Sequence, residues 1–268
     1  MANTIDWGKG TQNNTNGFGK YQNTIGAASV YAVSYAGETA LSASGGESFT
    51  NTKSIEFDGV DDRISISEIQ FTGEFTLSMW VNPAAITGNN TFILGRWDNN
   101  FDNDIQVNNE SGGSSTIRLR IGGTTLTFYG FTTNPDGVIP LNTWSNIILT
   151  RDGSNLITCF VNSIQFSTST YTNTNTLTLD SIGRVINNSY GWNGKLDEIS
   201  FFNTGLSSSD VSAIYNSGTP TDLSTYSSLI HWWRMGDGDT FPTITDNKGS
   251  NNGTMLNMAS DDIVENVP

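Results

Sequence analysis

Segments in which apolar and polar residues alternate recur through most of the chain. In 75–81 the apolar side chains of Phe75, Leu77, Met79 and Val81 fall on one face, the pattern of a half-buried β-strand. Similar segments are 54–57, 63–67, 92–97, 116–121, 125–129, 144–150, 156–161, 177–182 and 195–202. Turn residues separate them at intervals of roughly 8–15 residues. The pattern predicts an all-β fold, a two-sheet antiparallel sandwich that occupies residues 49–268.

One segment has helical periodicity instead. Residues 208–216 follow Ser207, a predicted N-cap, and Asp210 three residues later would complete a variant capping box. Gly218 stands where a left-handed C-terminal cap would fall. So short a helix does not hold alone, so we expect it to pack on the sandwich.

Residues 1–48 have a different pattern, an imperfect repeat in which an aromatic-Gly-Lys step is followed by Asn-Thr-x-Gly or a close variant. Too few apolar residues are present for a separate core. We predict an N-terminal extended arm, which is either flexible or docks its aromatic residues into a neighbouring subunit. The expected assembly contacts are Trp7, Lys9, Phe18, Lys20 and Tyr21.

The amino-acid composition argues against several classes of binding partner and of site. Twelve basic and 26 acidic residues give a net charge of −14, which argues against nucleic-acid binding and disfavours anionic membrane surfaces. The single cysteine, Cys159, excludes an internal disulfide, and its apolar neighbours favour a buried structural thiol. The single histidine, His231, excludes a multi-histidine zinc site. The first residues do not have the pattern of a secretory signal, and no apolar run is long enough to span a membrane.

Several motifs follow one another along the chain: Ser54–Asp62 (SIEFDGVDD), Phe75–Pro83 (FTLSMWVNP), Trp144–Gly153 (WSNIILTRDG), Ile182–Arg184, Gly194–Ile199 and Leu206–Asn216. In this order they resemble the motifs of laminin-G-like jelly rolls of the concanavalin A-like group. Residues 231–238 and 246–254 resemble the family's usual first strand and turn, but here they stand last. The resemblance therefore implies a jelly-roll sandwich with a circularly permuted strand order, in which 229–235 pairs inside the same sandwich.

The arm followed by such a domain also resembles structural proteins of tailed, especially marine, bacteriophages. That resemblance implies a virion protein of the head, collar or fibre, made in the host cytoplasm and released by lysis, which needs neither a signal peptide nor disulfides. It implies other virion proteins as partners through the arm, a homo-oligomer in the particle, and a glycan on the host surface as ligand.

Catalysis has weak support in the sequence. Retaining glycosidases on this fold use Glu-x-Asp-x-x-Glu, whereas this chain has Glu56-Phe57-Asp58-Gly59-Val60-Asp61, which reads as a structural turn. His231 lies in a predicted core strand and is expected to be a neutral, hydrogen-bonded residue. We therefore expect a non-enzymatic protein. A glycan depolymerase and a ligand-free mechanical decoration protein remain as alternatives.

Calcium is the one ion that the sequence favours, at two places. Asp98, Asn100, Asp102 and Asp104 offer oxygen ligands at alternate positions of a loop, although that loop lacks the glycine and glutamate of an EF-hand. The family resemblance implies a second site at Asp58, Asp61 and Asp62. For the first group the alternative is a solvated turn, because many Asp/Asn-rich hairpin tips hold no ion.

Glycan binding needs exposed aromatic rings flanked by polar side chains. The candidates are Phe101, Tyr129, Phe131, Tyr190 and Trp192. For Tyr190 and Trp192, the position that the family resemblance gives them before Gly194 favours packing instead. Trp80, Trp144 and Trp233 lie in alternating strands and are expected to pack internally. Arg96, Arg118 and Arg120 could line one sheet face and attract an acidic ligand, or form solvated cross-strand pairs. In 196–199, strand alternation turns one of two neighbouring acids inward, where it needs a partner such as Arg184.

Overall fold

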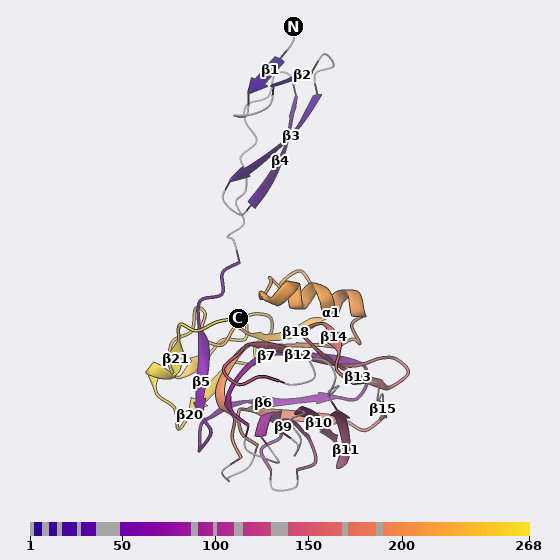
Figure 1. Cartoon of the computed structure of the whole chain (residues 1–268), viewed down its shortest axis with the longest axis vertical. Helices are drawn as coiled ribbons and strands as arrows, with labels where there is room; N and C mark the ends of the chain where they lie inside the picture. The colour runs from indigo at the N-terminus through magenta and orange to yellow at the C-terminus, as the bar shows by residue number, and fades with distance from the viewer. Residues whose placement is uncertain are drawn as a thin grey trace. The chain divides into compact units, whose positions relative to one another are not determined.

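The computed structural model describes residues 49–86, 91–98, 101–109, 115–129, 139–167, 171–185 and 190–268, and four strands in the first 48 residues. The chain divides into two units, Met1–Thr50 and Asn51–Pro268 (Figure 1).

The first unit contains two antiparallel strand pairs. Strand β1 (Asn3–Asp6) pairs with β2 (Thr11–Asn14), and β3 (Phe18–Ile25) pairs with β4 (Ala28–Tyr35). Of the expected assembly contacts, Trp7 and Lys9 lie outside the described residues. Phe18, Lys20 and Tyr21 belong to β3, whose side chains are also not described.

The second unit is a sandwich of two antiparallel sheets (Figure 1). The eight-stranded sheet has the order β11 (Thr124–Tyr129), β10 (Ser115–Ile121), β9 (Asp104–Asn109), β8 (Thr91–Gly95), β16 (Leu177–Ile182), β6 (Arg63–Phe71), β20 (Gly253–Leu256), β19 (Thr243–Ile244). The nine-stranded sheet has the order β14 (Ile164–Gln165), β13 (Leu156–Val161), β12 (Ser145–Arg151), β7 (Phe75–Ala85), β17 (Asn193–Phe202), β5 (Ser54–Asp58), β21 (Ile263–Val264), with β15 (Tyr171–Thr172) on β13 and β18 (Leu229–Trp233) on β17. The predicted two-sheet antiparallel sandwich is confirmed.

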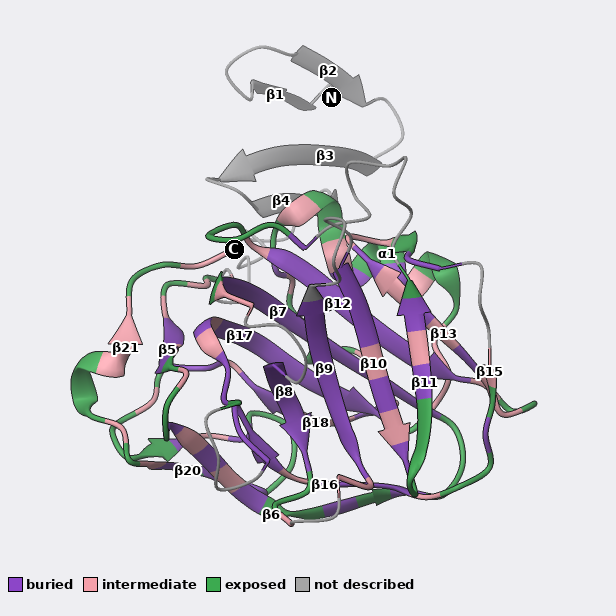
Figure 2. Cartoon of the chain, turned by 60° about the horizontal axis from the view of Figure 1, so that its bottom comes forward, coloured by how far each residue is buried: buried purple, intermediate pink, exposed green. Residues whose placement is uncertain are grey.

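The core lies between the two sheets and follows the alternation of the sequence. Phe75, Leu77, Met79 and Val81 of β7 are fully buried and face the opposite sheet. The polar positions between them are buried as well, so strand β7 is covered on both faces (Figure 2). Cys159 lies in this core, where burial raises its thiol pKa well above the ordinary value, in keeping with a structural thiol.

One α-helix covers the outer face of the nine-stranded sheet. Helix α1 (Ser208–Tyr215) begins at the Ser207 capping box, as predicted. It ends at Asn216, which takes the left-handed C-cap conformation that the sequence had led us to expect at Gly218. Tyr215 stacks on Trp80 of β7 with ring centroids 5.8 Å apart, which holds the helix against the sheet. The short 3-10 turns η2 (Asn216–Gly218) and η3 (Ser260–Asp262) follow.

The C-terminal segment completes both sheets. Strand β18 pairs with β17 so that Trp233 lies opposite Ile199 and His231 lies opposite Phe201. Strand β20 pairs with β6, and β21 pairs with β5. The segment that usually stands first in the family therefore lies inside the same sandwich, as the circular permutation implies. None of the described helices is long and apolar enough to cross a membrane.

A buried arginine connects the end of strand β12 in one sheet with the end of strand β6 in the other. Arg151, the last residue of β12, is fully buried and donates to three backbone carbonyls: Gly73 at 2.6 Å, Asn175 at 2.7 Å and Phe71 at 2.8 Å. Its guanidinium also lies 4.7 Å from the ring centroid of Phe75. The arginine of the Thr-Arg-Asp-Gly motif therefore has a structural explanation: it donates to carbonyl groups that would otherwise lack partners in the interior.

Candidate functional site

The acidic turn after β5 brings three carboxylates together. Asp58, Asp61 and Asp62 each offer an oxygen atom, and these atoms lie within 4.8 Å of one another. The turn is also held by its own hydrogen bonds: Asp58 accepts from the N–H of Val60 at 2.7 Å, and Asp62 accepts from the N–H of Asp58 at 2.8 Å. Burial and the neighbouring carboxylates raise the pKa of Asp62 to about 6. The donor set is all oxygen, and its spread fits Ca²⁺, whose oxygen ligands lie about 2.3–2.6 Å from the ion.

The other acidic loop does not form a comparable group among the described residues. Asp104 is fully buried on β9, where it accepts from Gln106 at 2.6 Å and lies 3.5 Å from the guanidinium of Arg120. Asp98 lies 3.6 Å from Arg96 instead. Asn100 is outside the described residues. Asp98, Asn100, Asp102 and Asp104 were expected to offer their oxygens from one loop. Asp104 is instead the first residue of β9, and its carboxylate pairs with Arg120 of the neighbouring strand.

The exposed aromatic candidates do not share a common place. Trp192 is fully buried, with its Nε1 donating to the carbonyl of Lys195 at 3.3 Å, so it cannot stack on a sugar and that prediction is wrong. Tyr129 and Tyr190 are exposed, at 58% and 41%. Phe131 lies outside the described residues. Phe101 is half-buried and stacks on Phe92 with ring centroids 5.8 Å apart.

An aromatic ring that the sequence analysis did not single out lies at the end of β8. Trp97 is 36% exposed, and its backbone N–H donates to Asp180 of β16 at 2.6 Å. The guanidinium of Arg63, from β6, lies 4.0 Å from the centre of its ring, and that of Arg184 lies 5.9 Å away. The sequence signal was a tryptophan at the boundary between a strand and an acidic loop.

Arginines gather on and beside the outer face of the eight-stranded sheet. We call Arg63, Arg96, Arg118, Arg120 and Arg184 the arginine face. Strands β8, β9 and β10 lie side by side there (Figure 2). Arg120 lies over Phe101, with its guanidinium 5.2 Å from the ring centroid, and donates to the Phe101 carbonyl at 3.2 Å. Burial raises the pKa of Asp104 to about 6 although Arg120 opposes it, and burial also raises the pKa of Asp180.

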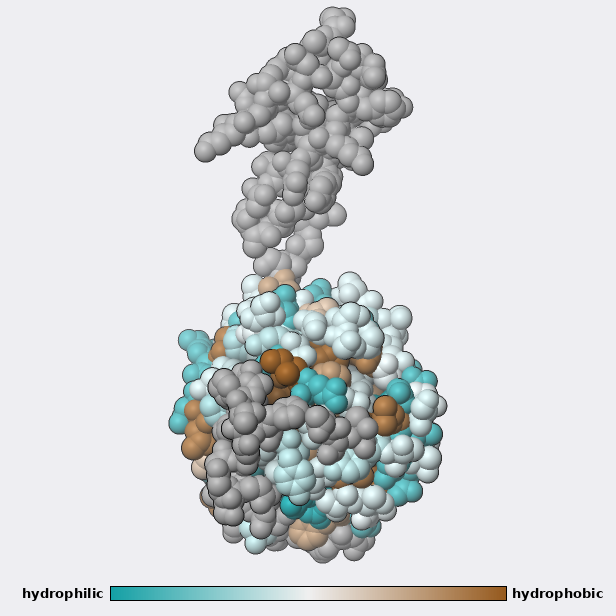
Figure 3. Space-filling view, turned by 45° about the vertical axis from the view of Figure 1, so that its right-hand side comes forward, coloured by the Kyte–Doolittle hydropathy of each residue, from teal (hydrophilic) through white to brown (hydrophobic). Residues whose placement is uncertain are grey.

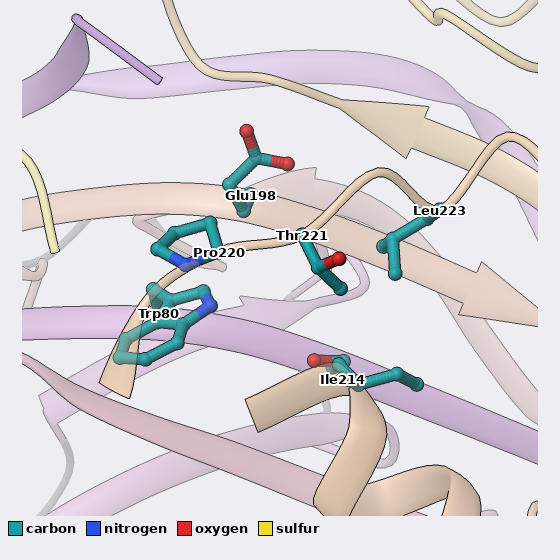
Figure 4. Close-up of a pocket in the computed structure, with 7 residues that line it drawn as sticks. Trp80, Glu198, Ile214, Pro220, Thr221 and Leu223 are labelled. Carbon is teal, nitrogen blue, oxygen red and sulfur yellow. The ribbon is translucent and has the colours of Figure 1, made fainter. Parts of the chain in front are cut away.

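The outer face of the nine-stranded sheet is covered. Trp80, Ile148 and Phe202 point outward from it, yet they are 3%, 0% and 0% exposed. A cavity of about 190 Å³, counting space open to solvent, lies between this sheet and α1. Figure 4 shows its lining, in which the carboxylate of Glu198 points away from Trp80 and Ile214. The cavity is therefore walled mainly by packed apolar side chains.

Two neighbouring acids in β17 are both buried, because a β-bulge interrupts the alternation there. Glu198 has a positive φ of 46° inside the register shift between Asp197 and Ser200. Its oxygens accept from Trp232 Nε1 at 2.5 Å and Arg234 Nε at 3.2 Å, so the expected partner Arg184 is replaced by Arg234. Burial raises the pKa of Glu198 to about 7 against the opposing charge of Arg234. Burial and the charge of Glu198 raise the pKa of Asp197 well above its ordinary value.

The single histidine lies in β18 and contacts the loop that follows this strand. His231 Nδ1 lies 2.6 Å from Asp246 Oδ2, and the ring stacks on Trp233. Burial acts to raise the pKa of Asp246, but hydrogen bonds from His231 and from the N–H groups of Gly249, Trp232 and Asn251 bring it well below its usual range. Asp246 thus organises the loop that follows β18, which fits the expected hydrogen-bonded, structural histidine.

Much of the surface between these sites is polar. In Figure 3 the apolar residues form small separate patches among hydrophilic ones. Tyr129, Leu141, Ile164 and Phe241 are among the exposed large apolar side chains of the described chain.

Comparisons with known proteins identify the family to which this fold belongs. The family model of the concanavalin A-like lectin/glucanases superfamily matches residues 58–212, more than half of the chain. Among solved structures, a putative carbohydrate binding protein from Bacteroides ovatus is similar, with 17% identity, a TM-score of 0.58, and coverage of 84% of this chain and 65% of that one. The chain thus spans slightly less than two thirds of that protein's length.

A heptameric SAP-like pentraxin from Limulus polyphemus is also similar, with 14% identity, a TM-score of 0.54, and coverage of 76% of this chain and 95% of that one. Among curated proteins, no sequence matches. The family resemblance carried by the motifs at 54–62, 75–83 and 144–153 is confirmed. The chain belongs to the concanavalin A-like lectin/glucanase superfamily.

Proposed function

We propose that the sandwich is a non-catalytic carbohydrate-binding module whose ligand lies on the outer face of the eight-stranded sheet. The observation that carries this proposal is the pairing of aromatic rings with fixed polar groups on that face. Trp97 is partly exposed beside Arg63 and Asp180, and Phe101 lies beneath Arg120. Sugar rings bind where an aromatic surface packs against their C–H groups and nearby polar side chains reach their hydroxyls.

The choice of face follows from burial. The nine-stranded sheet is covered on its outer side by α1, so its aromatic residues are not available to a polymer. On the other sheet, the side chains of Arg96 and Glu68 are 45% and 41% exposed around Trp97. The fold similarity to the Bacteroides ovatus protein, described as carbohydrate binding, supports the same function for this chain.

The proposal that the module is non-catalytic rests on the carboxylates that could serve as acid or nucleophile, because each of them is held in other contacts. Glu56 pairs with Lys195 at 2.9 Å, and Asp58 accepts the hydrogen bonds of its own turn. Glu198 uses both oxygens for Trp232 and Arg234. A glycan depolymerase, the competing hypothesis, needs an acid and a nucleophile facing one substrate.

A glycan array and affinity electrophoresis with the full-length chain test this function. We expect binding to at least one glycan, weakened about tenfold or more in Trp97→Ala. Ile164→Ala is the matched control, because Ile164 is 46% exposed but lies on the edge of the nine-stranded sheet. Absence of binding to every glycan would refute the module, and reducing-end release that is lost in Glu56→Gln would establish the depolymerase instead.

The module would hold Ca²⁺ at Asp58, Asp61 and Asp62. The support is the convergence of three carboxylate oxygens, with a fourth acid, Asp262, near enough to help raise the pKa of Asp62. A bound divalent cation would offset this repulsion and stiffen the turn between β5 and β6.

We further propose that residues 1–48 attach the module to a virion, as a decoration of its head, collar or fibre. The support is the aromatic-Gly-Lys repeat, together with the division of the chain after Thr50. Deleting residues 1–48 should leave a folded sandwich that no longer joins particles. Incorporation at the full-length level would contradict this role.

A further inference from the structure

The arginine face is a local exception to the charge of the chain. The sequence carries a net charge of −14, yet five of its seven arginines lie on or beside one sheet face. The acids among them are Glu68, Asp98, Asp104 and Asp180. Five cations against these four anions and the adjacent Asp102 leave the described part of this region close to neutral in an otherwise acidic protein, so it repels anions less than the rest of the surface does.

One half of the face is built around Trp97. Arg63 and Arg184 both direct their guanidinium groups toward this ring, and Arg96 precedes it in the chain. Three strands supply these residues, since β8, β16 and β6 are neighbours in the sheet. An indole surrounded by guanidinium groups offers an apolar surface and planar donors at the same place.

The other half is built on the pairing of β9 with β10. Asp104 faces Arg120 and Gln106 faces Arg118 across the two strands. Among the described residues, Arg118 Nε is a buried donor without a hydrogen-bond partner. Buried donors are rarely left without an acceptor, and a carboxylate or sulfate group is an acceptor of the kind that a guanidinium binds.

We propose that the face binds acidic sugars, those that carry carboxylate or sulfate groups. The guanidinium fork matches both anions in a bidentate manner, and the exposed part of Trp97 packs against the sugar ring. This inference rests on the proposed carbohydrate-binding function and adds the chemical class of the ligand.

The test compares charged and uncharged forms of the same polymers with the full-length chain at low salt. Polygalacturonate and its methyl ester differ in the carboxylate, and dextran sulfate and dextran differ in the sulfate. We expect retardation in affinity electrophoresis by one or both charged polymers and at least about tenfold weaker binding of the uncharged forms. Which charged polymer binds identifies the anion.

Two single variants locate the site, and a third controls for net charge. Arg96→Gln removes an exposed guanidinium, and Arg118→Gln removes the one whose Nε has no partner. Lys195→Gln removes the same charge from the nine-stranded sheet. We expect about fivefold to tenfold weaker binding of the charged polymer in the first two and no change in the third.

Equal binding of charged and uncharged polymers would overturn the inference and leave the proposed function standing. So would equal losses in all three variants, because net charge alone would then explain the preference. Binding to none of the four polymers, nor to any glycan of the array, would remove the proposed function together with the inference.

Discussion

Replacing Arg151 should destabilise the sandwich more than any change to an exposed arginine. Its guanidinium satisfies the carbonyls of Phe71, Gly73 and Asn175 from a fully buried position. Arg151→Met keeps most of the length of the side chain but leaves these three acceptors without their donor. Arg151→Lys keeps the charge but not the planar fork that reaches three carbonyls at once.

The magnitude follows from the three bonds. Each hydrogen bond to a charged group contributes about 1.5–3 kcal/mol, and part of this sum is offset because the variant no longer buries a charge. We therefore expect Arg151→Met to lower the free energy of unfolding by about 4 kcal/mol, and Arg151→Lys by about 2–3 kcal/mol. Since whole domains are stable by only about 5–15 kcal/mol, the Met variant would be marginal.

Urea denaturation followed by tryptophan fluorescence measures these differences as shifts in the midpoint at constant slope. Arg96→Met is the control, because the 45% exposed Arg96 side chain forms only long ion pairs and should contribute less than about 1 kcal/mol. If Arg151→Met unfolds within about 1 kcal/mol of the unmodified protein, the three carbonyls do not depend on Arg151 and the explanation of its motif fails.

Two further predictions concern ionisation and calcium. Because burial raises the pKa of Glu198 from 4.5 to about 7, the folded chain binds a proton that the unfolded chain releases between these values. Stability should therefore fall as pH rises from about 5 to about 8, by on the order of 3 kcal/mol from this group. Thermal unfolding across this range measures the trend, Glu198→Gln should make it shallower without removing it, because burial also raises the pKa values of Asp62, Asp104 and Asp197, and a melting temperature that rises with pH would contradict it. If Ca²⁺ binds the acidic turn, it should stabilise the fold by about 2.7 kcal/mol at 100 times its dissociation constant. Asp61→Asn should abolish this gain while the Asp58 and Asp62 turn bonds remain, and identical melting in Ca²⁺ and in chelator would rule out the site.

Local pattern was sufficient to predict most of the long strands of the sandwich and the helix, but not β9 or short strands such as β19, β20 and β21. The alternation in 75–81 identifies β7 because both the spacing of apolar residues and the burial of a sheet face have a period of two. The order of strands in the sheets is not a local property. Arg63, Trp97 and Arg184 meet only because β6, β16 and β8 are neighbours, and these strands are far apart in the chain.

Two failures have specific physical causes. Trp192 lies just before Gly194 in a segment without regular alternation, so periodicity gave no information on its burial, and only the family position before Gly194 favoured packing. The burial of both Asp197 and Glu198 depends on a β-bulge at Glu198, and a bulge in the middle of a strand changes which side chains face inward without altering the composition.

The central claim is that the outer face of the eight-stranded sheet binds sugars through its arginines. Nuclear magnetic resonance of the arginine Nε–H groups tests it directly, because all seven arginines report separately during titration with oligosaccharides of the charged polymer that binds. We predict shifts for the arginine face, and none for Arg151 and Arg234, which lie in the interior and at the end of β18. Shifts confined to Arg234 or Arg151, or no shifts at saturating ligand, would contradict the account.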